Sequence, residues 1–287
     1  MARFLVQKLR VWQVLSVLAV TLALLTFVGF YVRLWWFFDI ISHFRVQYFA
    51  ILLLLAFLFL LGKKYRQATF AGVFACINCL LIIPSTFGNT PNDLSKPTLR
   101  VSLINLANQN RNHEKAQDFI NDKHADILVL EEFNEVWREE LRETLKQYPF
   151  SAVSPQKNGW GIGLFSRIPL LHGKAYHPWR DPGDNSPIPY LKAKVEVDGK
   201  ILNLFAVHLL SPMNELRTKL RNKQLNYIRD RMKEENGTTM VMGDLNITLW
   251  SPIFQDFIKQ TQLRVLKGSL VHQPTWPTNF FPFLIPI

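Results

Sequence analysis

The sequence has little cysteine and little glycine or proline, and each scarcity excludes a class of protein. The only two cysteines among 287 residues, Cys76 and Cys79, lie within one apolar run. A disulfide framework is therefore excluded, and a Cys-x-x-Cys pair among Phe, Ile and Leu favours packing in a membrane over redox chemistry. Glycine and proline together make 29 residues, which excludes collagen-like and low-complexity chains. The 48% of hydrophobic residues is enough for a folded core.

Acidic side chains are almost absent from the first 90 residues, where Asp39 stands alone against eight Lys and Arg. This stretch carries +7 of the chain's net charge of +11, which leaves +4 for the other 197 residues. So mild a surplus does not by itself indicate nucleic-acid binding. The basic residues instead flank apolar runs, which is typical of a membrane region.

Three uncharged apolar runs predict three transmembrane helices, at residues 11–32, 46–61 and 68–87. The first run is long enough, as a helix, to span roughly 30 Å of hydrocarbon. A cleaved signal peptide is its alternative, but no small-x-small cleavage site closes the run, and the Trp35-Trp36 pair is typical of an interfacial anchor. Asn78, in the third run, is expected to contact a neighbouring helix.

The basic residues also predict an orientation. They concentrate before the first run and in the second loop, at Lys63, Lys64 and Arg66, so we expect both segments to be cytoplasmic. Arg33 and Arg45 in the first loop weaken this pattern without reversing it. Three spans then place the rest of the chain across the membrane. The prediction is a multi-pass protein of the bacterial inner (cytoplasmic) membrane with a periplasmic soluble domain.

A segment rich in Gly, Pro, Asn and Ser, at residues 88–97, predicts a linker between a membrane region at 1–87 and a soluble domain at 98–287. Periodicity and turn signals predict six strands and three helices in that domain. The strands are expected at 99–104, 126–130, 161–165, 191–197, 201–207 and 238–242, and the helices at 112–124, 135–147 and 214–235. This order predicts an α/β sandwich of two mixed sheets with helices outside.

Local patterns add detail to that prediction. Asp198-Gly199, between two of the strands, predicts a tight hairpin. Apolar stripes predict which helical side chains are buried. In the second helix they are Trp137, Leu141 and Leu145, and in the third Leu216, Leu220, Leu225, Ile228 and Met232.

Four polar residues stand just after predicted strands, where functional sites are commonly built: Asn105, Glu132, His208 and Asp244. Each alone is explained by a helix cap, a turn or the end of a hairpin strand. Together, a set rich in oxygen ligands suits a hard cation such as Mg²⁺ and a phosphate-ester substrate.

Five motifs occur in a familiar order: LINLANQN (103–110), ADILVLEE (125–132), GIGLFSR (161–167), FAVHLL (205–210) and GDLN (243–246). On these motifs the chain resembles the membrane-anchored bacterial branch of the endonuclease/exonuclease/phosphatase superfamily. The resemblance covers about residues 99–287 and implies a four-layer, deoxyribonuclease-like α/β sandwich. It also implies a metal-dependent phosphoric ester hydrolase that uses Mg²⁺ or Mn²⁺ on a nucleic-acid or phospholipid head-group substrate.

The resemblance assigns roles residue by residue. Glu132 is implied to be the principal metal ligand and Asn105 a metal and phosphate residue, while Glu131 stands where the family commonly has Gln or Leu and is expected to be a spectator. His208 is implied to contact the phosphate or protonate the leaving group. Asp244 would orient the attacking water or stabilise the transition state, and Asn246 would hold a non-bridging phosphate oxygen.

The sequence departs from the family pattern at its end. The family implies an Asp-His after an apolar strand and a later Ser-Asp-His that supplies the general base, whereas this sequence stops soon after Thr275-Trp276-Pro277. Two explanations compete: a truncated form of a longer enzyme, or a non-catalytic membrane protein whose outer domain binds a ligand or partner. An apolar terminus favours truncation. These 287 residues alone are therefore expected to be inactive or nearly so.

Overall fold

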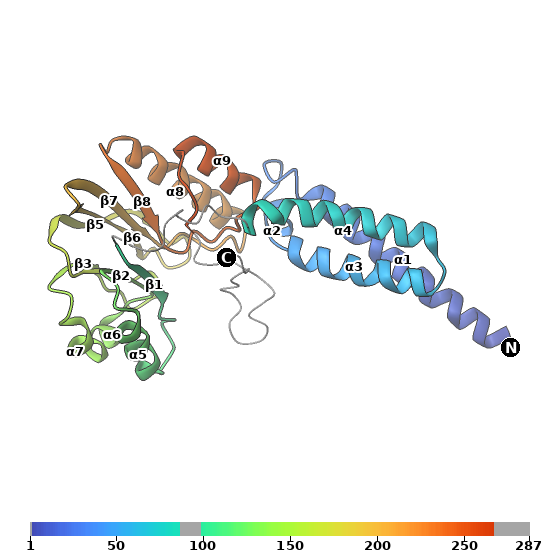
Figure 1. Cartoon of the computed structure of the whole chain (residues 1–287), viewed down its shortest axis with the longest axis horizontal. Helices are drawn as coiled ribbons and strands as arrows, with labels where there is room; N and C mark the ends of the chain where they lie inside the picture. The colour runs from blue at the N-terminus through green and yellow to red at the C-terminus, as the bar shows by residue number, and fades with distance from the viewer. Residues whose placement is uncertain (1, 87–98, 267–287) are drawn as a thin grey trace. The chain divides into compact units, whose positions relative to one another are not determined.

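A computed structural model describes residues 2–86 and 99–266 of the chain (Figure 1). Their contacts define two compact units, one made of residues up to 86 together with 247–266, and one made of 99–246. The predicted linker at 88–97 lies outside the described residues.

The first unit contains four helices from the N-terminal region. They are α1 (Ala2–Val28), α2 (Trp36–Ser42), α3 (Arg45–Leu61) and α4 (Tyr65–Thr86). Two of them contain windows long and apolar enough to cross a membrane, Arg10–Val28 in α1 and Tyr65–Ile83 in α4. A third span results if α2 and α3, which are bent by 58° relative to each other, form one broken span. The short helix α2 lies in what the sequence predicted to be a loop.

The helices of this unit pack through small and apolar side chains, including Ala19, Leu52, Phe59 and Ala71. Asn78 is fully buried, and its Nδ2 donates a hydrogen bond to Thr26 Oγ1 of α1 at 2.8 Å. The predicted contact of Asn78 with a neighbouring helix is therefore confirmed.

The segment after residue 246 packs with these helices. It contains α9 (Pro252–Thr261), which the sequence analysis did not predict. The Trp250 indole Nε1 donates to the Ser42 carbonyl at 2.8 Å, and His43 Nδ1 lies 2.8 Å from Thr248 Oγ1.

The second unit contains two four-stranded mixed sheets (Figure 1). The first has the order β1-β2-β4-β3, with strands β1 (Val101–Asn105), β2 (Ile127–Glu131), β3 (Phe150–Ser154) and β4 (Ile162–Ser166). The second has the order β5-β6-β7-β8, with strands β5 (Leu170–Arg180), β6 (Pro187–Val197), β7 (Lys200–Val207) and β8 (Thr238–Met242). Only the pairs β1/β2 and β7/β8 are parallel. β3 and β5 were not predicted.

The predicted hairpin is confirmed. Val197 pairs with Lys200, and the two residues between them, Asp198 and Gly199, have φ values of 50° and 72°. Both central residues of a type I′ turn need this left-handed region, which Asp tolerates and Gly adopts freely.

The two sheets pack face to face through side chains such as Val129 and Leu164 from the first and Leu191 and Leu204 from the second. The outer face of the first sheet is covered by α5 (His113–Lys123), α6 (Glu135–Glu140) and α7 (Arg142–Leu145). The helix α8 (Glu215–Lys233) packs on the second sheet, where Tyr227 contacts Trp179 and Tyr190. The fold is the four-layer α/β sandwich predicted from the sequence.

Two helix predictions need correction. The segment 135–147 forms two short helices, because the chain turns at Leu141, although Trp137, Leu141 and Leu145 are buried as predicted. Leu216 is wrongly predicted as core, since 55% of it is exposed. The buried face of α8 begins instead at Thr218, two residues further on, and two residues in a helix are about 200° apart.

Candidate active site

The parallel pairing of β1 and β2 brings two predicted site residues together. Asn105 at the end of β1 stands beside Glu131 in the register, so the carboxyl ends of both strands meet at one edge. The Asn105 Nδ2 donates to Glu132 Oε1 at 3.0 Å, and the backbone N–H of Asn108 donates to Glu132 Oε2 at 2.8 Å. Both oxygens of the predicted metal ligand are therefore held in place.

Glu132 adopts a conformation that costs energy. Its φ is 54°, in the left-handed region that residues other than glycine rarely adopt. Asn108, which fixes its carboxylate, is itself held by the Asn134 amide at 2.5 Å, and Asn134 also accepts the Trp137 N–H as the cap of α6. Strained residues held in this way are typical of functional sites.

The GDLN motif forms the other half of the site, after β8. Gly243 is required there because its φ is 139° and a Cβ atom would lie 1.7 Å from the Val207 carbonyl oxygen. The Asp244 Oδ1 accepts the N–H of Asn246 at 2.7 Å, and the Asp244 carbonyl accepts the N–H of Leu209 at 2.9 Å. The turn is thus attached to the segment that follows β7 and carries His208.

Asn246 uses its amide to fix this turn. Its Nδ2 donates to the Leu209 carbonyl at 2.7 Å, and its Oδ1 accepts the Ser211 hydroxyl at 3.0 Å. Arg221 of α8, fully buried, donates to the Asn246 carbonyl at 2.7 Å. Among the described residues, one of the two hydrogens on Asn246 Nδ2 has no acceptor and remains for a ligand.

Glu131 joins the two halves. It is the last residue of β2, it is 1% exposed, and its Oε1 accepts the backbone N–H of Asp244 at 2.6 Å. Burial raises the pKa of the Glu131 carboxyl to about 7, the proximity of His208 opposes that rise, and Asp244 and Glu132 add to it. Glu131 is therefore a structural link between the two halves, and the expectation that it is a spectator in the chemistry stays a prediction. The sequence predicted a strand that ends at residue 130 and gave no sign of this link.

The charges of the site influence one another. Burial also raises the pKa of the Asp244 carboxyl, and the proximity of His208 opposes this effect. His208 is buried, and its Nδ1 has no hydrogen-bond partner among the described residues. The structure thus brings Glu131, Asp244 and His208 within electrostatic reach of one another and pairs Asn105 with Glu132.

The donor set fits a magnesium ion. In the described part of the chain, no three His, Cys, Asp or Glu side chains converge into a complete metal cage. Mg²⁺ in phosphate-transfer sites is commonly bound by one or two carboxylates, with water and substrate oxygens completing the shell. Glu132 and Asn105 offer such a partial set, and two acids nearby, the buried Glu131 and the half-buried Asp244, favour a cation electrostatically.

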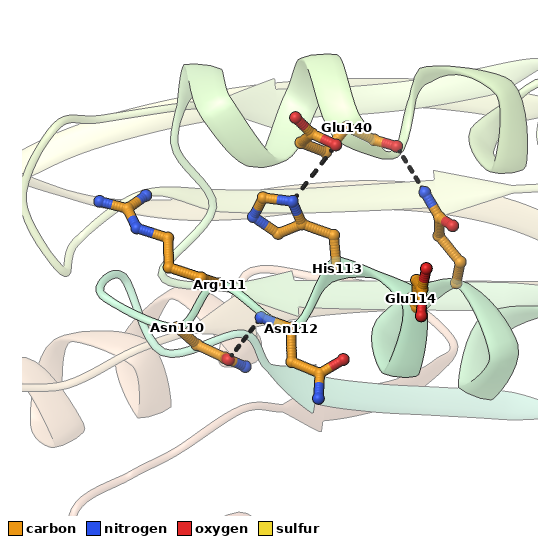
Figure 2. Close-up of a pocket in the computed structure, with 7 residues that line it drawn as sticks. Asn110, Arg111, Asn112, His113, Glu114 and Glu140 are labelled. Carbon is orange, nitrogen blue, oxygen red and sulfur yellow. Dashed lines mark hydrogen bonds and ion pairs between the residues drawn. The ribbon is translucent and has the colours of Figure 1, made fainter.

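A separate open pocket of about 830 Å³ lies along the loop between β1 and α5 (Figure 2). Figure 2 shows the His113 ring facing Glu140, with 3.2 Å between Nδ1 and the carboxylate, while Arg111 extends from the loop. None of the predicted site residues lines it. Residues 275–277 lie outside the described residues, and so does the segment from which the sequence predicts a truncated form.

Comparisons with known proteins complete this picture. A model of the endonuclease/exonuclease/phosphatase family matches residues 103–286. A phospholipase C of Staphylococcus aureus is 23% identical over 188 residues, which cover 54% of this chain and 55% of that protein. The chain thus spans about half the length of the curated relatives it matches.

Among solved structures, a β-hairpin deletion mutant of beta toxin from Staphylococcus aureus has a TM-score of 0.51 and 20% identity, covering 63% of this chain and 79% of that one. A double mutant of the same toxin with bound magnesium ions has a TM-score of 0.48 and 21% identity, with coverage of 57% and 70%. The first likeness is one of fold, and it confirms the deoxyribonuclease-like sandwich.

Proposed function

The chain belongs to the endonuclease/exonuclease/phosphatase family, and we propose that it is a membrane-tethered, Mg²⁺-dependent phosphoesterase that hydrolyses phosphodiesters. One observation carries this proposal. The Asn105–Glu132 pair of one sheet and the Asp244 turn of the other are tied together by the hydrogen bond from the Asp244 N–H to Glu131. The apolar windows in α1 and α4 support the tether.

The proposed mechanism divides the work among these side chains. Glu132 and Asn105 would hold Mg²⁺, which when bound would neutralise charge on the phosphate oxygens. Asp244 orients the attacking water. The Ser-Asp-His that the resemblance implies as general base is not among these 287 residues, so we assign the water's proton to the Asp244 carboxylate, which the raised pKa of that carboxyl assists. As the new P–O bond forms and the bond to the leaving oxygen breaks, His208 gives a proton to that oxygen. Asn246 holds a non-bridging oxygen through its remaining Nδ2 hydrogen.

A phospholipid head group is the substrate class that we favour over nucleic acid. A domain tethered by membrane helices meets lipid phosphodiesters continually, and the curated relatives named phospholipase C support the same class. The net charge of +4 beyond residue 90 is small for a nucleic-acid surface. We place the domain on the periplasmic side of a bacterial inner membrane, as the distribution of Lys and Arg predicts.

The test uses the 287-residue protein in lipid nanodiscs, with vesicles of phosphatidylcholine and sphingomyelin as substrate. Released phosphorylated head group is measured with Mg²⁺ and with EDTA, and plasmid DNA is assayed in parallel. Glu132→Ala should abolish release. The matched control is Glu135→Ala, because Glu135 is exposed and pairs only with Arg138 on its own helix among the described residues.

Each outcome decides between named alternatives. Mg²⁺-dependent release that Glu132→Ala abolishes supports the phosphoesterase and contradicts the expectation that these 287 residues are inactive. Cleavage of plasmid alone would move the substrate to nucleic acid. Absence of all hydrolysis, with a biological role that survives Glu132→Ala, would favour a non-catalytic protein that binds a ligand or partner.

A further inference from the structure

The orientation of His208 needs an explanation. A catalytic histidine is ordinarily held by a hydrogen bond to the ring nitrogen that does not react. Here Nδ1 of His208 is buried and has no such partner among the described residues. The ring instead packs against the indole of Trp160, with 5.3 Å between ring centroids and 54° between the planes. Among the described residues, the indole of Trp160 is thus the ring that packs against this imidazole.

Trp160 is itself fixed by a buried carboxylate. Its indole Nε1 donates to Asp181 Oδ2 at 2.9 Å. The same carboxylate accepts two bonds from the Nη2 of Arg217 in α8, at 2.7 and 2.8 Å, and one from the Gly183 N–H at 2.7 Å. Asp181 is 4% exposed, so water competes little for these bonds. The side chains of Trp160, Asp181 and Arg217 form a continuous chain of contacts that ends at His208.

The backbone that carries Trp160 is equally constrained. Gly161 must be glycine because a Cβ atom would lie 1.8 Å from the Phe133 carbonyl oxygen. The Phe133 N–H donates to the Gly161 carbonyl at 2.9 Å, and the Gln156 N–H donates to the Phe133 carbonyl at 3.1 Å. Phe133 follows Glu132 directly, so the loop 156–161 is attached beside the predicted metal ligand.

We propose that Trp160 is the positioning residue of His208, and that Asp181 and Arg217 hold it in place. This inference rests on the proposed function, in which His208 protonates the leaving oxygen. Trp160 acts through the imidazole and needs no contact with the substrate. A misplacement of a reacting group by about 1 Å can cost about 100-fold in rate. The aromatic contact therefore matters most for the step that needs the His208 proton.

Two phosphodiesters that differ only in the leaving group test the proposal. A p-nitrophenolate leaves without a proton, whereas an alkoxide needs one. We expect Trp160→Ala to lower kcat for the alkyl ester about 10- to 100-fold, with little change in KM. For the p-nitrophenyl ester the loss should stay within about threefold. His208→Ala should show the same selectivity, and the double variant should be no worse than His208→Ala, because both changes remove one function.

Further variants separate the effect of the Trp160, Asp181 and Arg217 contacts from an effect on general stability. Trp160→Phe keeps a ring against His208 but loses the N–H bond to Asp181, so its loss for the alkyl ester should be smaller. Arg217→Ala should reproduce the selectivity in weaker form. The matched control is Arg138→Ala, since Arg138 is exposed and pairs with Glu135 on its own helix. It should leave both substrates unchanged.

A spectroscopic readout does not depend on turnover. In ¹³C-histidine-labelled protein, the His208 ring signal, identified by its loss in His208→Ala, should shift in Trp160→Ala because the indole ring current is removed. It should also move in Arg217→Ala and stay in place in Arg138→Ala. Unchanged signals in both test variants would overturn the proposal even if the wild-type protein hydrolyses nothing.

The kinetic outcomes are equally decisive. An equal loss on both esters in Trp160→Ala, beside a selective loss in His208→Ala, would make Trp160 merely structural. If His208→Ala showed no selectivity between the two leaving groups, His208 would not be the proton donor, and the inference would be overturned. If the wild-type protein is inactive on both esters, the proposed function is refuted. The His208 ring signals then still show whether Trp160 holds the His208 ring.

Discussion

Replacing Glu131 by Gln should remove a pH-dependent loss of stability from the metal-free protein. Glu131 is buried, and burial is the main cause that raises the pKa of its carboxyl from 4.5 to about 7. Gln keeps an oxygen that accepts the Asp244 N–H but cannot ionise. The variant therefore separates the charge of residue 131 from its hydrogen bond.

The sign and size follow from linkage. Below pH 4.5 the carboxyl is neutral in the folded and the unfolded chain, so its ionisation costs nothing. As the pH rises through 4.5 and up to about 7, the unfolded chain ionises first and the folded state loses stability. The difference between the two pKa values corresponds to about 3 kcal/mol. For a domain of this size, that is a fall in Tm of roughly 6 to 12 °C.

Thermal unfolding of the detergent-solubilised protein in EDTA, at several values from pH 4 to pH 8, measures this effect. The wild-type Tm should fall relative to that of Glu131→Gln as the pH rises. Glu131→Leu is the control for the hydrogen bond, because it leaves the Asp244 N–H without its acceptor and should cost about 1 to 3 kcal/mol at every pH. Parallel pH curves for wild type and Glu131→Gln would refute the reasoning.

Three further predictions concern the metal, one glycine and one tryptophan. Added Mg²⁺ should raise the Tm more at pH 8 than at pH 5, because it favours ionised carboxylates, and Glu132→Gln should remove most of that gain; an equal gain at both pH values would argue against a carboxylate site. Gly161→Ala should prevent folding or lower the Tm by more than any surface change, since its Cβ would meet the Phe133 carbonyl oxygen at 1.8 Å, and a Tm equal to wild type would contradict that geometry. Trp250→Phe should lower the Tm of the first unit because the buried Ser42 carbonyl loses its donor at 2.8 Å; circular dichroism during heating would detect it, and an unchanged melt would show that water replaces the bond.

Elements with a strong local signal were predictable from the sequence. The Asp198-Gly199 hairpin and the capped helix starts at Asn112 and Asn214 lie where the residues indicate, since each depends on neighbours in the chain. The strand β5 gave no such signal. It contains Pro178, and its register shifts between Tyr176 and Trp179. Most of the strand is exposed, and apolar and polar residues do not alternate along it in the way that predicts a strand.

The residues of the candidate site also fall into those that the sequence predicted and those that it did not. Residues that follow strands were found by sequence, because the carboxyl ends of parallel strands meet at one edge of a sheet; Asn105 beside Glu132 is an example. The roles of Glu131 and Trp160 were not found. Glu131 reaches Asp244 only because two sheets pack face to face, and Trp160 meets His208 from a loop whose course no local pattern specifies.

Two residues of the site have an unusual backbone conformation, which six other described non-glycine residues, among them Lys63 and Gln262, also adopt. Glu132 and Asn246 have φ values of 54° and 50°, and a left-handed conformation costs a residue such as Glu on the order of 1 kcal/mol and costs Asn less. Glycine would adopt either conformation without that cost. A carboxylate at position 132 and an amide at position 246 thus stand where glycine would be conformationally easier. Hydrogen bonds from Asn105 and Asn108, and to Leu209, compensate for the strain. The contacts of these two side chains, rather than the turns, therefore account for the residue types at the two positions.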